Sequence, residues 1–188
     1  MININSLVNK SIRNIVVNIF AGAGLVKAFE TIEGVEIYTL NCEKVREYRI
    51  YCDRNVEKFI SVFIDSGCAC NIGGLILIGD KFNSKVHKFI IGHELGHLKH
   101  SDGKITVLGF IKNVIRFIIT RQCYLIDDPL KELRADEYAR NFCGYSITAE
   151  ELLDGIIQNY QYALDDFENL EEDLKSYVLS GLNASGQF

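Results

Sequence analysis

An α+β fold is predicted by a change in the spacing of apolar residues along the chain. Residues 35–79 hold short runs rich in Ile, Val, Tyr and Phe between turn residues, which is typical of strands. From Ser84 onward the apolar residues recur about every 3.6 positions, as they do in helices. The chain has 188 residues, of which 48% are hydrophobic and 24% charged. We expect a single domain, 1–188, with a helix and a sheet in residues 1–83 and helices throughout residues 84–188.

The N-terminal half is expected to form one helix followed by a small, mainly antiparallel sheet. Apolar residues from Ile12 to Ala23 keep a helical spacing, and Asn18 interrupts them, which favours a core-facing helix over a signal peptide. Four later runs have the composition of strands, namely Val35–Leu40, residues 48–52, residues 59–65 and Leu75–Gly79.

The C-terminal half is expected to be helical. A long helix should start near Asp80 or Ser84, either of which can serve as its N-cap. Asp128 as N-cap and Pro129 at the first helical position indicate a second helix, which should end near Gly144. Two acidic helices should follow, over residues 148–162 and 167–179.

Two histidines with a glutamate between them, His93, Glu94 and His97, lie on the first of these helices. Imidazoles four positions apart project from one helix face and can share a metal ion, while Glu94 lies within reach of a metal-bound water. A catalytic Zn²⁺ takes three protein ligands and leaves one position open for that water. We therefore expect one Zn²⁺ per chain, bound by His93 and His97, with Glu94 as the general base. The alternative is an ordinary amphipathic helix with two hydrogen-bonded histidines.

Glu132 is the expected third zinc ligand. The connection that follows His97 is long enough to bring the second helix back, antiparallel, against the first. Gly92 and Gly96 would remove side-chain bulk where that helix approaches. The two helices together would then supply three ligands to one ion.

Two further polar residues are candidates for the same site. His100 is a rival third ligand, but along a straight helix it lies about 10.5 Å from His93, too far for one ion to bind both together with His97. It is better suited to a position beside the ligands or on the surface. Asp136, one turn beyond Glu132, can accept the other ring N–H of a zinc-bound histidine or can pair with a nearby arginine.

A zinc hydrolase also needs a group that stabilises the oxyanion of the transition state. No histidine follows His100 in the chain, so the candidates for this role are Tyr138, Arg140 and Tyr145. The sequence leaves the choice among the three open.

Charge and cysteine content restrict the class of protein. The net charge is -5 and the Lys and Arg residues are scattered, so we expect no nucleic-acid partner. Six cysteines are too few for a disulfide framework in a chain of this size and favour reduced thiols in a cytoplasmic protein. Cys68 and Cys70 form the one close pair, whose spacing suits a soft metal or an oxidant sensor and also arises incidentally in turns.

A separate apolar stretch runs from Ile105 to Ile119. This stretch is shorter than the roughly 20 residues needed to span a bilayer. Lys112 and Arg116 lie four positions apart and share one helical face. Two interpretations stay open, namely a core helix with a solvated side and a helix that covers the cleft or makes peripheral contact with a membrane.

The pattern His93-Glu94-x-Gly96-His97 followed by Glu132-x-x-Ala135-Asp136-x-x-Ala139 resembles the gluzincin metallopeptidases, in particular the HtpX and CAAX-prenyl-endopeptidase group and the soluble minigluzincins. The resemblance implies a zincin-like fold and a zinc-dependent endopeptidase that acts on a protein or peptide substrate. It also implies that the two histidines and Glu132 bind the zinc ion, and that Asp136 supports a ligand.

The resemblance extends to the residues before the helix. Residues 71–78 resemble the strand that these families place above the cleft. The resemblance implies an exposed edge to which an extended peptide adds by backbone pairing, and we expect this edge at Leu75, Ile76, Leu77, Ile78 and Gly79. This region also resembles the ImmA/IrrE proteins, whose cleavage targets are DNA-bound repressors. Those proteins usually have Asn where this chain has Asp136.

Two functions are therefore considered. The first is a zinc-dependent endopeptidase that hydrolyses peptide bonds through a metal-activated water. The second is a latent or non-catalytic zinc protein that acts as a regulatory or protein-interaction module, with residues 105–119 blocking the cleft. The lack of an obvious oxyanion residue favours the second function, whereas Glu94 favours the first because a structural zinc site needs no base.

Overall fold

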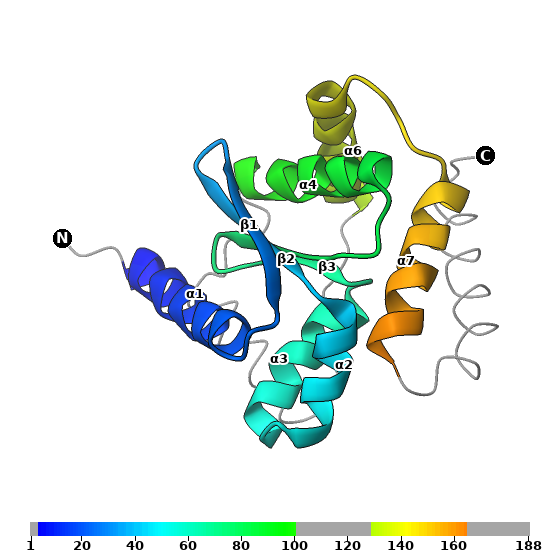
Figure 1. Ribbon diagram of the computed structural model, residues 1–188. Helices are drawn as coiled ribbons and strands as arrows, with labels where there is room; N and C mark the ends of the chain where they lie inside the picture. The colour runs from blue at the N-terminus through cyan, green and yellow to red at the C-terminus, as the bar shows by residue number, and fades with distance from the viewer. Residues whose placement is uncertain (1–3, 101–128, 165–188) are drawn as a thin grey trace.

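The computed structural model describes residues 4–100 and 129–164, which form a four-stranded sheet and six helices (Figure 1). The elements along the chain are α1 (Ile4–Gly22), β1 (Val26–Ile32), β2 (Val35–Leu40), α2 (Cys42–Tyr51), α3 (Arg54–Asp65), β3 (Ala69–Ile72), β4 (Leu75–Gly79), α4 (Ser84–Lys99), α6 (Pro129–Cys143) and α7 (Ala149–Ala163). The predicted α+β class is confirmed. The predictions for Asp128 and for residues 105–119 and 167–179 lie outside the described residues.

Two segments that were predicted as strands are helical, so those predictions are wrong. Residues 48–51 form the end of α2, with Cys52 as its C-cap, and residues 59–65 belong to α3. The buried side chains of Ile60, Phe63 and Ile64 lie three and four positions apart on one face of α3. Packing that face into the core outweighs the local preference of Ile, Val and Phe for strands.

The sheet is mixed rather than mainly antiparallel. Its strand order is β1-β2-β4-β3, in which β1 with β2 and β3 with β4 are antiparallel pairs, while β2 and β4 are parallel. A parallel pair needs a long crossover between its strands. Here the crossover runs through α2, α3 and β3, and two of these three elements are the helices that were predicted as strands.

Strand β4 lies inside the sheet, so the prediction of an exposed edge strand is wrong. Leu75, Ile76, Leu77, Ile78 and Gly79 pair with β2 on one side and with β3 on the other, and all five residues are buried. An uninterrupted apolar run of this kind is typical of a strand that is covered on both faces. In the described part of the chain, the edge strands are β1 and β3.

Helices cover both faces of the sheet (Figure 1). On one face Ile37, Ile76 and Ile78 pack against apolar residues of α4. On the other face Leu75 and Leu77 share a core with residues of α1, α2, α3 and α7. None of the described helices is both long enough and apolar enough to cross a membrane.

Local capping residues set the ends of the helices. Asn83, and neither Asp80 nor Ser84, is the N-cap of α4, since its side chain accepts hydrogen bonds from two backbone N–H groups of the first turn at 3.1 and 3.0 Å. The carboxylate of Asp80 instead accepts the first backbone N–H of α2, at 3.1 Å. Helix α6 is described from Pro129 to Cys143, and Gly144 follows its last residue with a φ of 77°, which glycine adopts without strain, so the predicted end near Gly144 is confirmed.

Candidate metal centre

Helices α4 and α6 lie against each other (Figure 1). Glycines of α4 face alanines of α6 at this contact. A Cβ atom on Gly96 would lie 2.8 Å from the Cα of Ala135, and a Cβ atom on Gly92 would lie 3.0 Å from the Cα of Ala139. A methyl group at either glycine would therefore push the facing backbone away. The contacts run in opposite order along the two helices, so the helices are antiparallel, as predicted.

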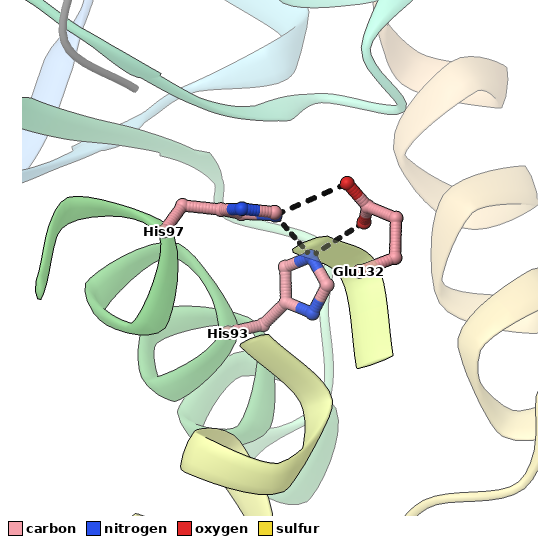
Figure 2. Close-up of side chains that lie close together, drawn as sticks. All are labelled: His93, His97 and Glu132. Atoms are coloured by element: carbon pink, nitrogen blue, oxygen red, sulfur yellow. Dashed lines mark hydrogen bonds and ion pairs between the residues drawn. The ribbon is translucent and has the colours of Figure 1, made fainter. Parts of the chain in front are cut away.

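Figure 2 shows His93 and His97 of α4 directed toward Glu132 of α6. The Nε2 atoms of the two histidines lie 3.0 Å apart, and they lie 3.2 and 3.4 Å from the carboxylate oxygens of Glu132. Ligand atoms of a tetrahedral zinc site, each about 2.1 Å from the ion, are separated by about 3.4 Å. The three side chains therefore have a spacing that fits three ligands of one zinc ion.

The described part of the chain contains one potential metal-ligand group of this kind. Among the residues that the structure describes, His93, His97 and Glu132 are the one set of three or more His, Cys, Asp or Glu side chains whose ligand atoms all lie within 4.8 Å of one another. His100, the rival ligand, is the exposed C-cap residue of α4 and is not a member of the group.

Asp136 contacts His93 on the side of the ring that faces away from the ligand group. Its Oδ1 atom lies 2.8 Å from Nδ1 of His93. An ionised carboxylate can only accept hydrogen bonds, so Nδ1 carries the proton. The lone pair on Nε2 of a neutral His93 is then directed at the site where a metal would bind. This is the contact that the spacing of Glu132 and Asp136 predicted.

The charges of the site favour a cation between the ligands. Burial lowers the pKa of His93, but hydrogen bonds with Asp136 and Glu132 outweigh burial and raise that pKa to about 10. Burial raises the pKa of Glu132, but hydrogen bonds with His93 and His97 outweigh it and lower that pKa to about 2. Carboxylates thus surround the imidazoles closely enough to hold a positive charge, whether a proton or a metal ion brings it.

Glu94 is buried, with 8% of its surface exposed, and it is not a member of the ligand group. Its Oε2 atom accepts a hydrogen bond from Nδ2 of Asn71, at 2.5 Å. Asn71 lies on β3 and was not among the predicted site residues. The signal that could have identified Asn71 is a polar side chain on an otherwise apolar face of two adjoining strands.

The three oxyanion candidates make hydrogen bonds away from the ligand group. The hydroxyl of Tyr138 donates to Oε2 of Glu33 in the β1–β2 turn, at 2.7 Å. Arg140 donates from Nε to the backbone oxygen of Asp136, one turn earlier on α6, at 3.3 Å. The hydroxyl of Tyr145 donates to the backbone oxygen of Lys85, at 2.8 Å, near the start of α4 and about 12 Å along that helix from His93.

The close cysteine pair has the properties of core thiols. Cys68 and Cys70 are both buried and belong to the core on the face of the sheet opposite α4. Burial raises the pKa of Cys70 to about 12, which keeps that sulfur protonated and unreactive. Neither residue belongs to a metal-binding group among the described residues. These contacts favour an incidental CxC spacing.

Comparisons of the chain with known protein families, with curated proteins and with solved structures find no match.

Proposed function

We propose that this chain is a zinc-dependent endopeptidase that hydrolyses peptide bonds of a protein substrate. The observation that carries the proposal is the geometry of the ligand group, in which His93, His97 and Glu132 have the spacing of three zinc ligands. A structural zinc site is usually closed by four protein ligands, whereas a catalytic site has three and an open position. The buried Glu94 beside this group is the second support, because a structural site needs no base.

Each side chain of the site has a defined part in the proposed reaction. His93, His97 and Glu132 would hold Zn²⁺, which would supply Lewis acidity and lower the pKa of a bound water. Glu94 takes a proton from the water as its oxygen adds to the peptide carbonyl carbon, and delivers that proton to the leaving amine when the C–N bond breaks. Asp136 keeps His93 in the tautomer that presents Nε2 to the metal.

The substrate is proposed to lie along β3 rather than β4. In the described part of the chain β3 pairs only with β4, so its other side has backbone groups available for an added strand. The contact between Asn71 of β3 and Glu94 brings this strand next to the proposed base. An extended peptide that pairs with β3 would therefore pass close to Glu94.

A cytoplasmic location forms part of the proposal. The five cysteines in the described residues are free thiols, namely Cys42, Cys52, Cys68, Cys70 and Cys143. Free thiols are typical of proteins in reducing compartments.

A non-catalytic zinc protein is the second candidate function. The observation that favours it concerns the three oxyanion candidates. Their hydrogen bonds, made by Tyr138, Arg140 and Tyr145, lead away from the ligand group. In that case the two helices would bind zinc to stabilise a surface for protein contacts, and the chain would regulate a partner without cleaving it.

The two functions are separated by comparing the wild type with Glu94→Gln. Glutamine has nearly the same size as glutamate but cannot take the proton from water. We expect about one zinc ion per chain in both proteins and hydrolysis of an unfolded protein such as reduced casein by the wild type alone. The control is Glu47→Gln, which changes an exposed glutamate of α2 and should preserve hydrolysis. Equal hydrolysis by Glu94→Gln contradicts the proposed mechanism, and a zinc-loaded wild type that hydrolyses nothing supports the non-catalytic function.

A further inference from the structure

Asn71 is a polar side chain on the face of the sheet that packs against α4. It pairs with Ile76 of the interior strand β4. Residues opposite each other in a strand pair point to the same face of the sheet. Ile76 packs with Ile37 and Ile78 against α4, so Asn71 is directed toward α4 as well. It occupies the edge of an otherwise apolar surface, where a polar residue needs a partner.

The partner of Asn71 is Glu94, which is a buried residue. An ionised carboxylate has acceptor sites only, so the Nδ2–H group of Asn71 must be the donor and Oε2 of Glu94 the acceptor. This bond ties one carboxylate oxygen to a strand that is itself held by pairing with β4. The direction of the other oxygen, Oε1, is restricted as a consequence.

A general base requires this kind of restraint. A catalytic group has to be held within about 0.5 Å of its productive position. A misplacement of about 1 Å can reduce the rate about 100-fold. The neutral amide of Asn71 can orient the carboxylate without the full positive charge of a Lys or Arg, which would make the base weaker.

We infer that Asn71 is a positioning residue for Glu94, and that it holds the carboxylate of the base in the orientation that receives a proton from the attacking water. This inference rests on the proposed function, since Glu94 needs a fixed orientation only if it acts as the base. Asn71 itself exchanges no proton with the substrate. It acts through Glu94, and the effect of removing it depends on Glu94 being present.

The kinetic test compares Asn71→Ala with the wild type. In Asn71→Ala, we expect kcat to fall about 10- to 100-fold with little change in KM and with the zinc content unchanged. The control is Asn41→Ala, which removes the N-cap hydrogen bond to Lys44 of α2 and should lower stability without lowering kcat.

A second measurement does not depend on hydrolysis. Thermal unfolding of the metal-free wild type, Asn71→Ala, Glu94→Ala and the double variant forms a double-mutant cycle. The combined loss of Tm should be smaller than the sum of the two single losses, because both substitutions remove the same hydrogen bond. Additive losses overturn the inference.

The outcomes separate this inference from the proposed function. If the wild type hydrolyses protein and Asn71→Ala retains the wild-type kcat, the inference is overturned and the proposed function stands. An equal loss of kcat from Asn71→Ala and from the control Asn41→Ala also overturns it. If the wild type hydrolyses nothing, the proposed function fails, and the unfolding cycle alone decides whether Asn71 holds Glu94.

Discussion

Glu132 and Asp136 lie one turn apart on α6 and contact opposite nitrogens of a single imidazole. Oε2 of Glu132 lies 3.2 Å from Nε2 of His93, and Oδ1 of Asp136 lies 2.8 Å from Nδ1 of the same ring. Glu132 also contacts His97, at 3.4 Å. The two carboxylates therefore have different relations to the site, in which Glu132 is placed as a ligand and Asp136 as the residue that orients one.

The first prediction separates these two roles by zinc affinity. Glu132→Ala should lose zinc almost completely, because it removes one of three ligands. Asp136→Ala should keep a weakened site, with an affinity about 10- to 100-fold lower, as is typical when a residue that orients a ligand is lost. Competition with a zinc chelator measures both affinities. Glu137→Ala changes an exposed carboxylate of the same helix and is the control. Equal losses from Glu132→Ala and Asp136→Ala would contradict the assignment.

The second prediction concerns the contact between α4 and α6. In Gly96→Ala the added Cβ would lie 2.8 Å from the Cα of Ala135, so the helices must separate. We expect destabilisation of about 1–3 kcal/mol and a lower zinc affinity, because Glu132 moves away from the histidines. Chemical denaturation and chelator competition measure the two effects. Gly22→Ala is the matched control, since a Cβ there meets nothing within 4 Å and should stabilise α1 by at most about 1 kcal/mol. A Gly96→Ala protein with wild-type zinc affinity would exclude this coupling.

The third prediction concerns the pH dependence of the metal-free protein. The pKa of His93 is raised from 6.5 to about 10, so its contribution to stability is complete below pH 6.5 and is lost as the pH rises toward 10. The pKa of Glu132 is lowered from 4.5 to about 2, so its contribution is present above pH 4.5 and is lost as the pH falls toward 2.

Asp136→Asn isolates this effect from other groups that titrate at high pH. Asparagine cannot supply the negative charge that helps to hold the proton on His93. The difference in Tm between the wild type and Asp136→Asn, measured in EDTA, should therefore be largest near pH 6 and should shrink toward pH 10. A difference that stays constant over this range would show that the proton on His93 does not stabilise the fold.

The fourth prediction concerns the tyrosines that were candidates for oxyanion stabilisation. Tyr138→Phe and Tyr145→Phe remove hydroxyls that donate to Glu33 and to the backbone of Lys85. We expect kcat to change less than about threefold in either variant, since loss of a true oxyanion donor costs about 100- to 1000-fold. Steady-state kinetics of protein hydrolysis measure kcat for the two variants and the wild type. A loss of about 100-fold in one of them would identify that tyrosine as the donor.

Some of the architecture could be predicted because it depends on local spacing. The interval between His93 and His97 places both side chains on one face of any α-helix, whatever surrounds it. Gly144 marks the end of α6 through its own backbone preference. The close approach at Gly92 and Gly96 was predictable for a similar reason, because the absence of a side chain is a property of the residue alone.

The errors occurred where distant contacts outweigh local preference. Residues 59–65 have the composition of a strand, yet they are helical because Ile60, Phe63 and Ile64 are buried on a single face. Strand β4 has the same apolar run in any position of the sheet, and only pairing with both β2 and β3 makes it an interior strand.

The sequence by itself determined which residues of the candidate site can bind a metal, since ligand chemistry and helical periodicity are properties of residue type and spacing. Tertiary structure decided which of these residues meet. Contact between two helices brings Glu132 to His93 and His97, and the pairing of β3 with β4 brings Asn71 to Glu94. The side chains in each of these contacts come from elements far apart in the chain, so their distances depend on how the whole core packs, which local spacing does not encode.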